Sequence, residues 1–333
     1  MVRAFLAFLL VLLVAGAAQA ATGTVHLHNG EEVSGKLVLL GEKRVCVRTA
    51  RGVVKEFTRE QVKYVTVRVK RADGKIVTRR VLSRPKPLEM PFRLETRHFV
   101  IQTDTGRHVC KNAGRAMEQL YKEFQDIFGV KEGAQAKKTE LVIFKEKADF
   151  LAYAKDLGGQ LREGTLGFYR WAADGRSQIV AYKRQTEEHH TLSTLYHEAT
   201  HHFLKLALGR QPPLWLNEGL AVFFETSRWE RGRLKTGVIP RRRLKLLQRA
   251  VKLDRHYPLA KLMTFGKDKY DALAYAEGWS LVYFLLDKAG RKRFGQYLQK
   301  LRDGDDPDEA FKSSFTDDIQ KLEEKWKAYV ENL

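Results

Sequence analysis

The sequence predicts an α+β protein, in which a mixed sheet packed against helices follows a small all-β unit. Three observations lead to this fold class. Short β-branched runs between turn residues fill the first part of the chain, prolines cluster around Pro87, and strands then alternate with amphipathic helices. The chain has 333 residues, of which 44% are hydrophobic and 30% charged. This composition is typical of globular domains, and the length is sufficient for two of them.

The first twenty residues differ in character from the rest of the chain. Arg3 gives a positive start, Phe5 to Val14 is apolar, and Ala18-Gln19-Ala20 ends the segment with small residues. This order is typical of a secretory signal peptide, here residues 1–20. The apolar run is shorter than the roughly 20 residues that a membrane-spanning helix needs. We therefore expect no transmembrane segment in the mature chain, and an exported protein located in the periplasm or outside the cell.

Residues 21–84 are expected to form a small β-barrel domain. The strand-like runs are 24–28, 33–40, 44–49, 53–57 and 65–69, with a further one at 75–81. Turn dipeptides separate them, namely Asn29-Gly30, Gly41-Glu42, Arg51-Gly52 and Asp73-Gly74. So many short strands in about sixty residues favour a small open barrel. The pattern is similar to that of Sm-like barrels, and no residue in it has an evident chemical role.

A proline-rich linker is expected at residues 85–91, where Pro85, Pro87 and Pro91 disfavour helix. The second domain is expected to occupy residues 92–333. Its strands are predicted at 99–103, 140–144 and 178–182, and its first helices at 111–128 and 148–157. From Thr191 onward the pattern is mostly helical.

The motif Tyr196–His201 carries the strongest chemical signal. His197 and His201 are four residues apart, so on a helix both imidazoles face the same way and can bind one metal ion. Glu198 lies beside them, where its carboxylate can take a proton from a water molecule. Apolar residues at helical spacing, from Leu192 to Leu206, predict that this segment is a helix held in the core.

A third ligand is expected from the next helical run. A catalytic zinc site commonly has three protein ligands and keeps one position open. Glu218 opens that run, sixteen residues after His201. With His197 and His201 it would complete a Zn²⁺ site. Glu225 lies seven residues later on the same helical face, where it either accepts the outer ring N–H of a ligand histidine or is an ordinary surface glutamate.

Two segments resemble a known family. Trp215-Leu216-Asn217-Glu218-Gly219, followed by Glu225, resembles the corresponding segment of gluzincin-clan zinc metallopeptidases, the group of thermolysin and the zinc aminopeptidases. Tyr275-Ala276-Glu277-Gly278 resembles their Tyr-x-x-Gly segment. The order of segments from Phe92 to Leu333 is similar to that of uncharacterised exported bacterial gluzincin-like proteins. The resemblance implies a zincin-like fold and a hydrolase that cleaves peptides or proteins. The Gly-x-Met-Glu-Asn motif of the aminopeptidases is not found before the metal-binding helix. The resemblance therefore does not extend to aminopeptidase specificity.

The resemblance also implies a role for Tyr275, whose counterpart in the family stabilises the oxyanion of the tetrahedral intermediate. A phenol with a pKa near 10 stays protonated at neutral pH and can donate to developing negative charge. Tyr270 is the alternative donor. The catalytic residues are therefore expected to be Glu198, as general base, and Tyr275.

Other residues near the motif are expected to be structural or to line the cleft. His202 falls on the apolar side of the helix, about 140° from His197, and is expected to be packed. In gluzincins the strand before the metal-binding helix forms the sheet edge that binds an extended peptide, which points to residues 178–182. Gly167-Phe168-Tyr169 is expected to contribute to the same wall, although either segment could equally be plain core.

The formal charge of +20 raises the question of a polyanionic partner. The basic residues are spread along the chain, and the densest cluster, Arg241 to Lys245, has no interleaved aromatic residues, so we expect no nucleic acid. An anionic envelope surface or an acidic substrate fits an exported protein, and a solvated surface without a partner fits equally well.

Cys46 and Cys110 could form a bridge or remain two buried thiols. The alternative function is a catalytically silent exported binding protein that acts through its β-barrel domain.

Overall fold

The computed structural model describes residues 22–40, 44–58, 61–70, 76–83, 90–129, 137–157, 161, 164–171, 177–183, 188–231 and 233–333. The chain divides into two compact units, the first comprising Met1–Glu89 and Ala148–Glu163, the second Met90–Lys147 and Gly164–Leu333. The expected signal peptide, Pro85 and Pro87 of the expected linker, and the turns at Gly41-Glu42 and Asp73-Gly74 lie outside the described residues.

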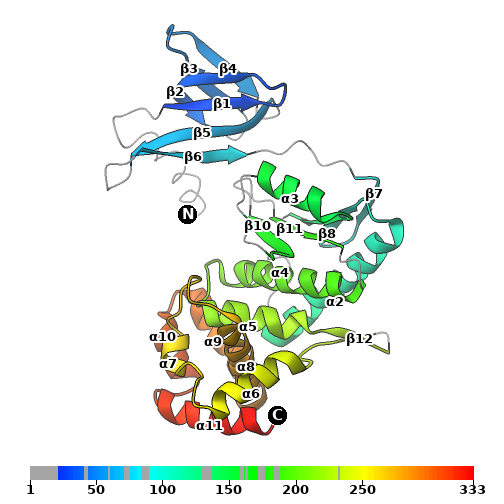
Figure 1. Ribbon diagram of the computed structural model, residues 1–333, viewed down its shortest axis with the longest axis vertical. Helices are drawn as coiled ribbons and strands as arrows, with labels where there is room; N and C mark the ends of the chain where they lie inside the picture. Colours follow the sequence, from blue (N-terminus) through cyan, green and yellow to red (C-terminus); the bar gives the residue numbers. More distant parts are fainter. Residues whose placement is uncertain are drawn as a thin grey trace. The chain divides into compact units, whose positions relative to one another are not determined.

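The first unit is built on one antiparallel sheet. Its strands are β1 (Thr22–Leu27), β2 (Glu32–Leu40), β3 (Arg44–Arg48), β4 (Val54–Thr58), β5 (Val62–Lys70) and β6 (Ile76–Ser83), in the order β4-β3-β2-β1-β5-β6 (Figure 1). Alternating valines on these strands form its core, and Val25, Val45, Val47, Val62 and Val65 are fully buried. Most of helix α3 (Lys147–Asp156) groups with this unit.

The structure limits the barrel prediction for this unit, because its described strands form an open sheet and not a closed barrel. Among the described strands the hydrogen-bonded ladder does not close, and β4 and β6 are its two edges. The reason lies at β5, which pairs with β1 on one side and with β6 on the other, from Tyr64↔Ser83 to Lys70↔Ile76. Because β6 occupies the outer edge of β5, that edge is not available to β4. The unit is a small open β sheet.

The second unit contains the mixed sheet that the sequence predicts, and the α+β fold class is confirmed. The strands are β7 (Phe92–Glu95), β8 (Phe99–Thr103), β9 (Thr139–Phe144), β10 (Gly167–Trp171) and β11 (Ser177–Tyr182), in the order β10-β11-β9-β8-β7. Strands β8, β9 and β11 are parallel, whereas β7 and β10 run antiparallel at the two edges. Helices α2 (Arg107–Phe128) and α4 (Glu188–Leu208) pack on the sheet and against each other.

The rest of this unit is helical apart from one hairpin. Its elements are α5 (Leu214–Glu225), β12 (Arg228–Glu230), β13 (Arg233–Lys235), α6 (Arg241–Lys252), α7 (Leu259–Leu262), α8 (Ala272–Lys288), α9 (Gly290–Asp303), α10 (Pro307–Ser314) and α11 (Ile319–Glu331). Helix α4 lies between the sheet and α5, and α5 packs against α8 (Figure 1). No helix in the described part of the chain is long and apolar enough to cross a membrane.

Candidate active site and metal centre

Helix α4 brings two histidines to the face that meets α5. Leu195, Ala199 and Phe203 are at most 1% exposed and anchor the opposite side of the helix in the core. The Nε2 atoms of His197 and His201 lie 3.5 and 3.7 Å from Glu218 Oε2, which α5 supplies. Ligand atoms of the three residues all lie within 4.8 Å of one another. The structure thus brings together the three residues that the sequence predicts as metal ligands.

The donor atoms fit a metal ion. The Glu218 side chain is buried, and its Oε2 atom has no hydrogen-bond partner although it faces both imidazoles. Donors at 2.0–2.1 Å from a tetrahedral zinc ion are separated by about 3.3 Å, close to the two His–Glu distances. Two imidazoles and one carboxylate form a donor set that suits zinc. His197, His201 and Glu218 could therefore hold a metal ion.

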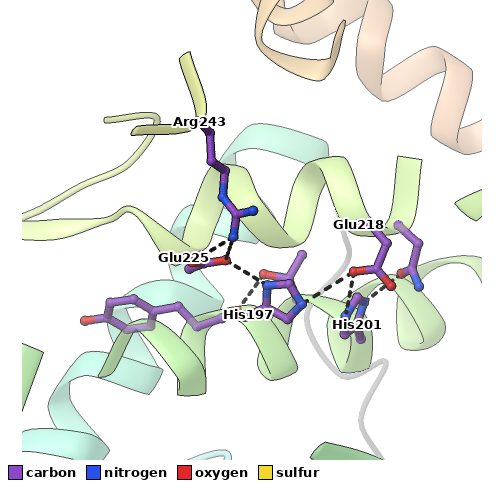
Figure 2. A network of polar contacts seen from close by, with 8 residues as sticks. His197, His201, Glu218, Glu225 and Arg243 are labelled. Carbon is purple, nitrogen blue, oxygen red and sulfur yellow. Dashed lines mark hydrogen bonds and ion pairs between the residues drawn. The ribbon is translucent and has the colours of Figure 1, made fainter. Parts of the chain in front are cut away.

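The outer nitrogen of each histidine has its own partner. His197 Nδ1 lies 3.1 Å from Glu225 Oε2, and His201 Nδ1 lies 3.0 Å from Asn217 Oδ1. Arg243 extends the network, since its Nη2 donates to both carboxylate oxygens of Glu225 at 3.4 and 3.5 Å (Figure 2). Because Nδ1 donates to these oxygens, Nε2 is the nitrogen left to bind a metal.

The first of the two interpretations of Glu225 is confirmed as far as its contact is concerned, since Glu225 is hydrogen-bonded to His197 rather than being an ordinary surface glutamate. The contribution of Asn217 to His201 and of Arg243 to Glu225 was not predicted. Asn217 stands next to Glu218 in the motif, but nothing in the sequence pattern separates it from an ordinary helix residue. Arg243 belongs to the basic cluster, and only the packing of α6 near the end of α5 reveals its partner.

Charges concentrate at His197. Burial lowers its pKa, but the adjacent carboxylates of Glu218 and Glu225 outweigh that effect and raise the pKa to about 10. Burial lowers the pKa of His201, and the neighbouring charge of His197 lowers it further. Burial acts to raise the pKa of Glu218, yet the two histidines hold it below its usual value. The carboxylates of this network therefore favour positive charge beside Glu218, as a cation site requires.

A cavity of about 930 Å³ opens beside His197 and is lined in part by His197, Glu198, Tyr270 and Tyr275. This volume falls within the range of roughly 300–1,000 Å³ that is usual for ligand sites. Glu198 lies near β10, where a Cβ atom added to Gly167 would be 3.3 Å from Glu198 Cγ. The predicted general base therefore lines the same cavity as a ligand histidine.

The two candidate tyrosines differ in position. Tyr275, in the first turn of α8, is half-buried and lines the cavity, and burial together with the charge of Glu218 raises its pKa to about 12. Tyr270 also lines the cavity, but its hydroxyl is buried against α8, where a Cβ on Gly278 would lie 2.3 Å from it. The two rings contact each other edge to face at 4.9 Å. Tyr275 has the more accessible phenol.

The prediction of the sheet edge is wrong for residues 178–182. Strand β11 pairs with β9 on one side and with β10 on the other, so it lies inside the sheet. Among the described strands β10 is the outer strand on this side, and Gly164, Thr165, Leu166 and Gly167 at its start line the cavity. The segment Gly167-Phe168-Tyr169, expected to contribute to the wall, therefore forms the edge strand itself.

Two further predictions concern residues away from the metal centre. His202 is fully buried and its Nε2 lies 2.7 Å from Thr139 Oγ1, so it is packed as predicted. Burial lowers its pKa to about 3, which keeps the ring neutral. Cys46 and Cys110 are both free and buried.

Comparison with known proteins supports the geometry. Residues 189–332 match the model of the Peptidase MA superfamily. This segment contains most of α4 and all of α5 to α8, and therefore all three candidate metal ligands, Glu198 and Tyr275. The match is consistent with a peptidase of the gluzincin type. No curated protein matches the chain.

Proposed function

We propose that the protein is a zinc-dependent metallopeptidase that hydrolyses peptide bonds outside the cytoplasm. The observation that carries the proposal is the convergence of His197, His201 and Glu218, together with a cavity that His197 and Glu198 both line. The superfamily match over this segment supports peptide hydrolysis, and the signal-peptide pattern at residues 1–20 supports export.

Zinc held by His197, His201 and Glu218 would supply Lewis acidity, which lowers the pKa of a water molecule and polarises the scissile carbonyl. Each protein group then has a defined task. Glu225 and Asn217 fix the rings of His197 and His201 through their Nδ1 atoms. Strand β10, the outer strand on this side of the described sheet, begins at the cavity and would form the wall along which a peptide lies.

Glu198 and Tyr275 would carry the chemical step. The Glu198 carboxylate takes a proton from the attacking water and transfers it to the leaving nitrogen. The phenol of Tyr275, with its pKa raised to about 12, remains protonated at neutral pH and donates a hydrogen bond to the oxyanion. Both side chains line the cavity where the substrate would lie.

Substitution of Glu198 by Gln tests the proposal. Glutamine keeps the shape of the side chain and removes the base, so zinc content should stay at the wild-type level. Hydrolysis of a peptide library should fall by about 10² or more, the range of general-base catalysis. Zinc is measured by elemental analysis and cleavage by mass spectrometry, with Glu146→Gln, an exposed residue outside the cavity, as the matched control.

Two results would contradict the proposal. Wild-type cleavage by Glu198→Gln would show that Glu198 is not the base. If the unmodified zinc-loaded protein cleaves no peptide in a broad library, the protein is instead a catalytically silent exported binding protein.

A further inference from the structure

Four arginines line the cavity that contains His197 and Glu198. Arg241, Arg242 and Arg243 form the first turn of α6, and Arg228 begins β12. The basic cluster of the sequence is thus not a remote surface feature. Its third member contacts Glu225, the partner of His197, and its Cζ atom lies 5.7 Å from the centre of the Tyr275 ring.

Three of these arginines form no ion pair with any residue that the structure describes. Arg228, Arg241 and Arg242 are exposed, and no carboxylate in the described part of the chain forms an ion pair with them. Arg243 differs, because it is half-buried and paired with Glu225. Guanidinium groups form forked hydrogen bonds that match a carboxylate.

The acidic residues that line the cavity are already engaged or assigned. Glu225 binds His197 and Arg243. Asp271 caps α8 by accepting from the backbone N–H groups of Leu273 and Ala274, and it accepts a hydrogen bond from the Tyr257 hydroxyl. Glu198 is the proposed base. None of these acidic residues neutralises Arg241 or Arg242, so that side of the cavity stays positively charged.

We propose that this arginine wall, formed by Arg228, Arg241 and Arg242, binds a carboxylate of the substrate and selects acidic peptides. This inference rests on the proposed peptidase function and names its substrate class. The carboxylate can belong to an Asp or Glu side chain or to the C-terminus of the peptide. Two or three partly exposed charge pairs should together favour such a peptide by about tenfold.

The test uses three kinds of fluorogenic peptide, all of the same length. The first carries one internal Glu and an amidated C-terminus, the second carries Gln and a free C-terminal carboxylate, and the third carries Gln and an amide. The Glu position is moved along the peptide on both sides of the cleaved bond. The kcat/KM ratio of the first or second peptide to the third should be about ten in dilute buffer and decrease with added salt.

A pair of double variants locates the effect. Arg241→Gln/Arg242→Gln should reduce the ratio to about one, with the larger loss on the carboxylate-bearing peptide. Lys245→Gln/Arg249→Gln removes the same charge from exposed positions further along α6 that do not line the cavity, and it should keep the ratio. If the Arg241→Gln/Arg242→Gln variant loses activity mainly on the peptide with the internal Glu, the arginines bind a substrate side chain. If it loses activity mainly on the peptide with the free C-terminal carboxylate, they bind the C-terminus of the substrate.

Binding gives a second measurement that does not need turnover. Fluorescein-labelled versions of the peptides are titrated against zinc-loaded Glu198→Gln protein with and without Arg241→Gln/Arg242→Gln, and anisotropy is recorded. Selective binding of the carboxylate peptides without hydrolysis by wild type would keep the arginine wall and remove the peptidase proposal. Hydrolysis without carboxylate preference, or an equal loss in both double variants, would overturn the arginine wall and leave the peptidase proposal standing.

Discussion

Two Glu-Gly pairs meet where α5 packs against α8, and the pKa values of their glutamates are shifted in opposite directions. Glu218-Gly219 lies on α5 and Glu277-Gly278 on α8. The glycines allow the two backbones to approach, since a Cβ on Gly219 would lie 2.4 Å from the Gly278 carbonyl oxygen. Both glutamates are buried, at 7% and 0% exposure, and each has an Oε2 atom without a hydrogen-bond partner.

The difference between them is what each carboxylate faces. Glu218 faces the imidazoles of His197 and His201, which hold its pKa down despite burial. Glu277 accepts a single backbone hydrogen bond, from Tyr257 N–H at 2.9 Å, and no cation lies beside it among the described residues. Burial raises the pKa of Glu277 to about 8, and the charges of Asp271 and Glu323 act in the same direction. The comparison teaches that burial alone does not make a metal ligand, because convergent donors are also required.

The largest expected effect is the loss of zinc when a proposed metal ligand is replaced. Substitution of His197, His201 or Glu218 by Ala should each remove most of the zinc, of which we expect about one ion per chain in the unmodified protein, because three ligands are the minimum for such a site. Glu277→Gln, in the equivalent position on the facing helix, should keep full zinc. Elemental analysis after dialysis against a weak chelator measures the content, and full occupancy in all three Ala variants would refute the site.

The next effect concerns the two tyrosines. Tyr275→Phe should keep zinc and lower kcat by about 10² to 10³, because it removes an oxyanion donor. The ring and its contact with Arg243 remain, so substrate binding should be similar. Tyr270→Phe removes a hydroxyl that is buried against Gly278, and it should change kcat much less. Steady-state kinetics on one peptide compare the two, and a larger loss in Tyr270→Phe would assign the donor role to Tyr270.

A smaller effect on zinc affinity is expected from residues that contact the proposed ligands but not the metal. Glu225→Gln keeps the shape of the side chain but weakens the hydrogen bond to His197, and loss of such a partner typically costs 10- to 100-fold in metal affinity or activity, so we expect about tenfold weaker zinc binding. Arg243→Gln, one step further away, should cost less. Competition with a chromophoric chelator measures zinc affinity. Glu324→Gln on α11 is an exposed control, and equal affinities in all four proteins would show that Glu225 does not support the ligand.

The local part of the site was predictable from the sequence, and the non-local part was not. His197, Glu198 and His201 follow from the spacing of one helix, and Glu218 from the need for a third ligand on the next helix. The position of β10 as an outer strand depends on the pairing order of the described sheet, which no local pattern encodes. The open N-terminal sheet has the same cause, since β6 adds to β5 rather than leaving it to close a barrel.

The same limit applies to charge. The composition indicates a basic protein, and the sequence shows the cluster from Arg241 to Lys245. Only the fold divides that cluster into Arg243, which pairs with Glu225, Arg241 and Arg242, which line the cavity, and Lys245, which does not. The pKa of Glu277 is equally non-local, because burial in the fold raises it and a hydrogen bond from the distant Tyr257 N–H opposes that rise.

The smallest effect is a pH dependence of stability that belongs to Glu277 alone. Its pKa is about 8 in the folded chain against 4.5 for an ordinary glutamate, so between these values the folded state holds a proton that the unfolded state releases. Stability conferred by this group is therefore fully present below about pH 4.5 and is lost as the pH rises toward 8, by at most about 1.4 kcal/mol per pH unit.

Glu277→Gln mimics the protonated form, since its amide oxygen can accept from Tyr257 N–H. The variant should match wild type near pH 5 and be more stable near pH 8, as measured by urea unfolding across this range. Other titrating groups are common to both proteins and cancel in the difference, so a difference that does not change with pH would show that Glu277 is ionised in the fold and that the contrast with Glu218 is one of ligands, not of charge.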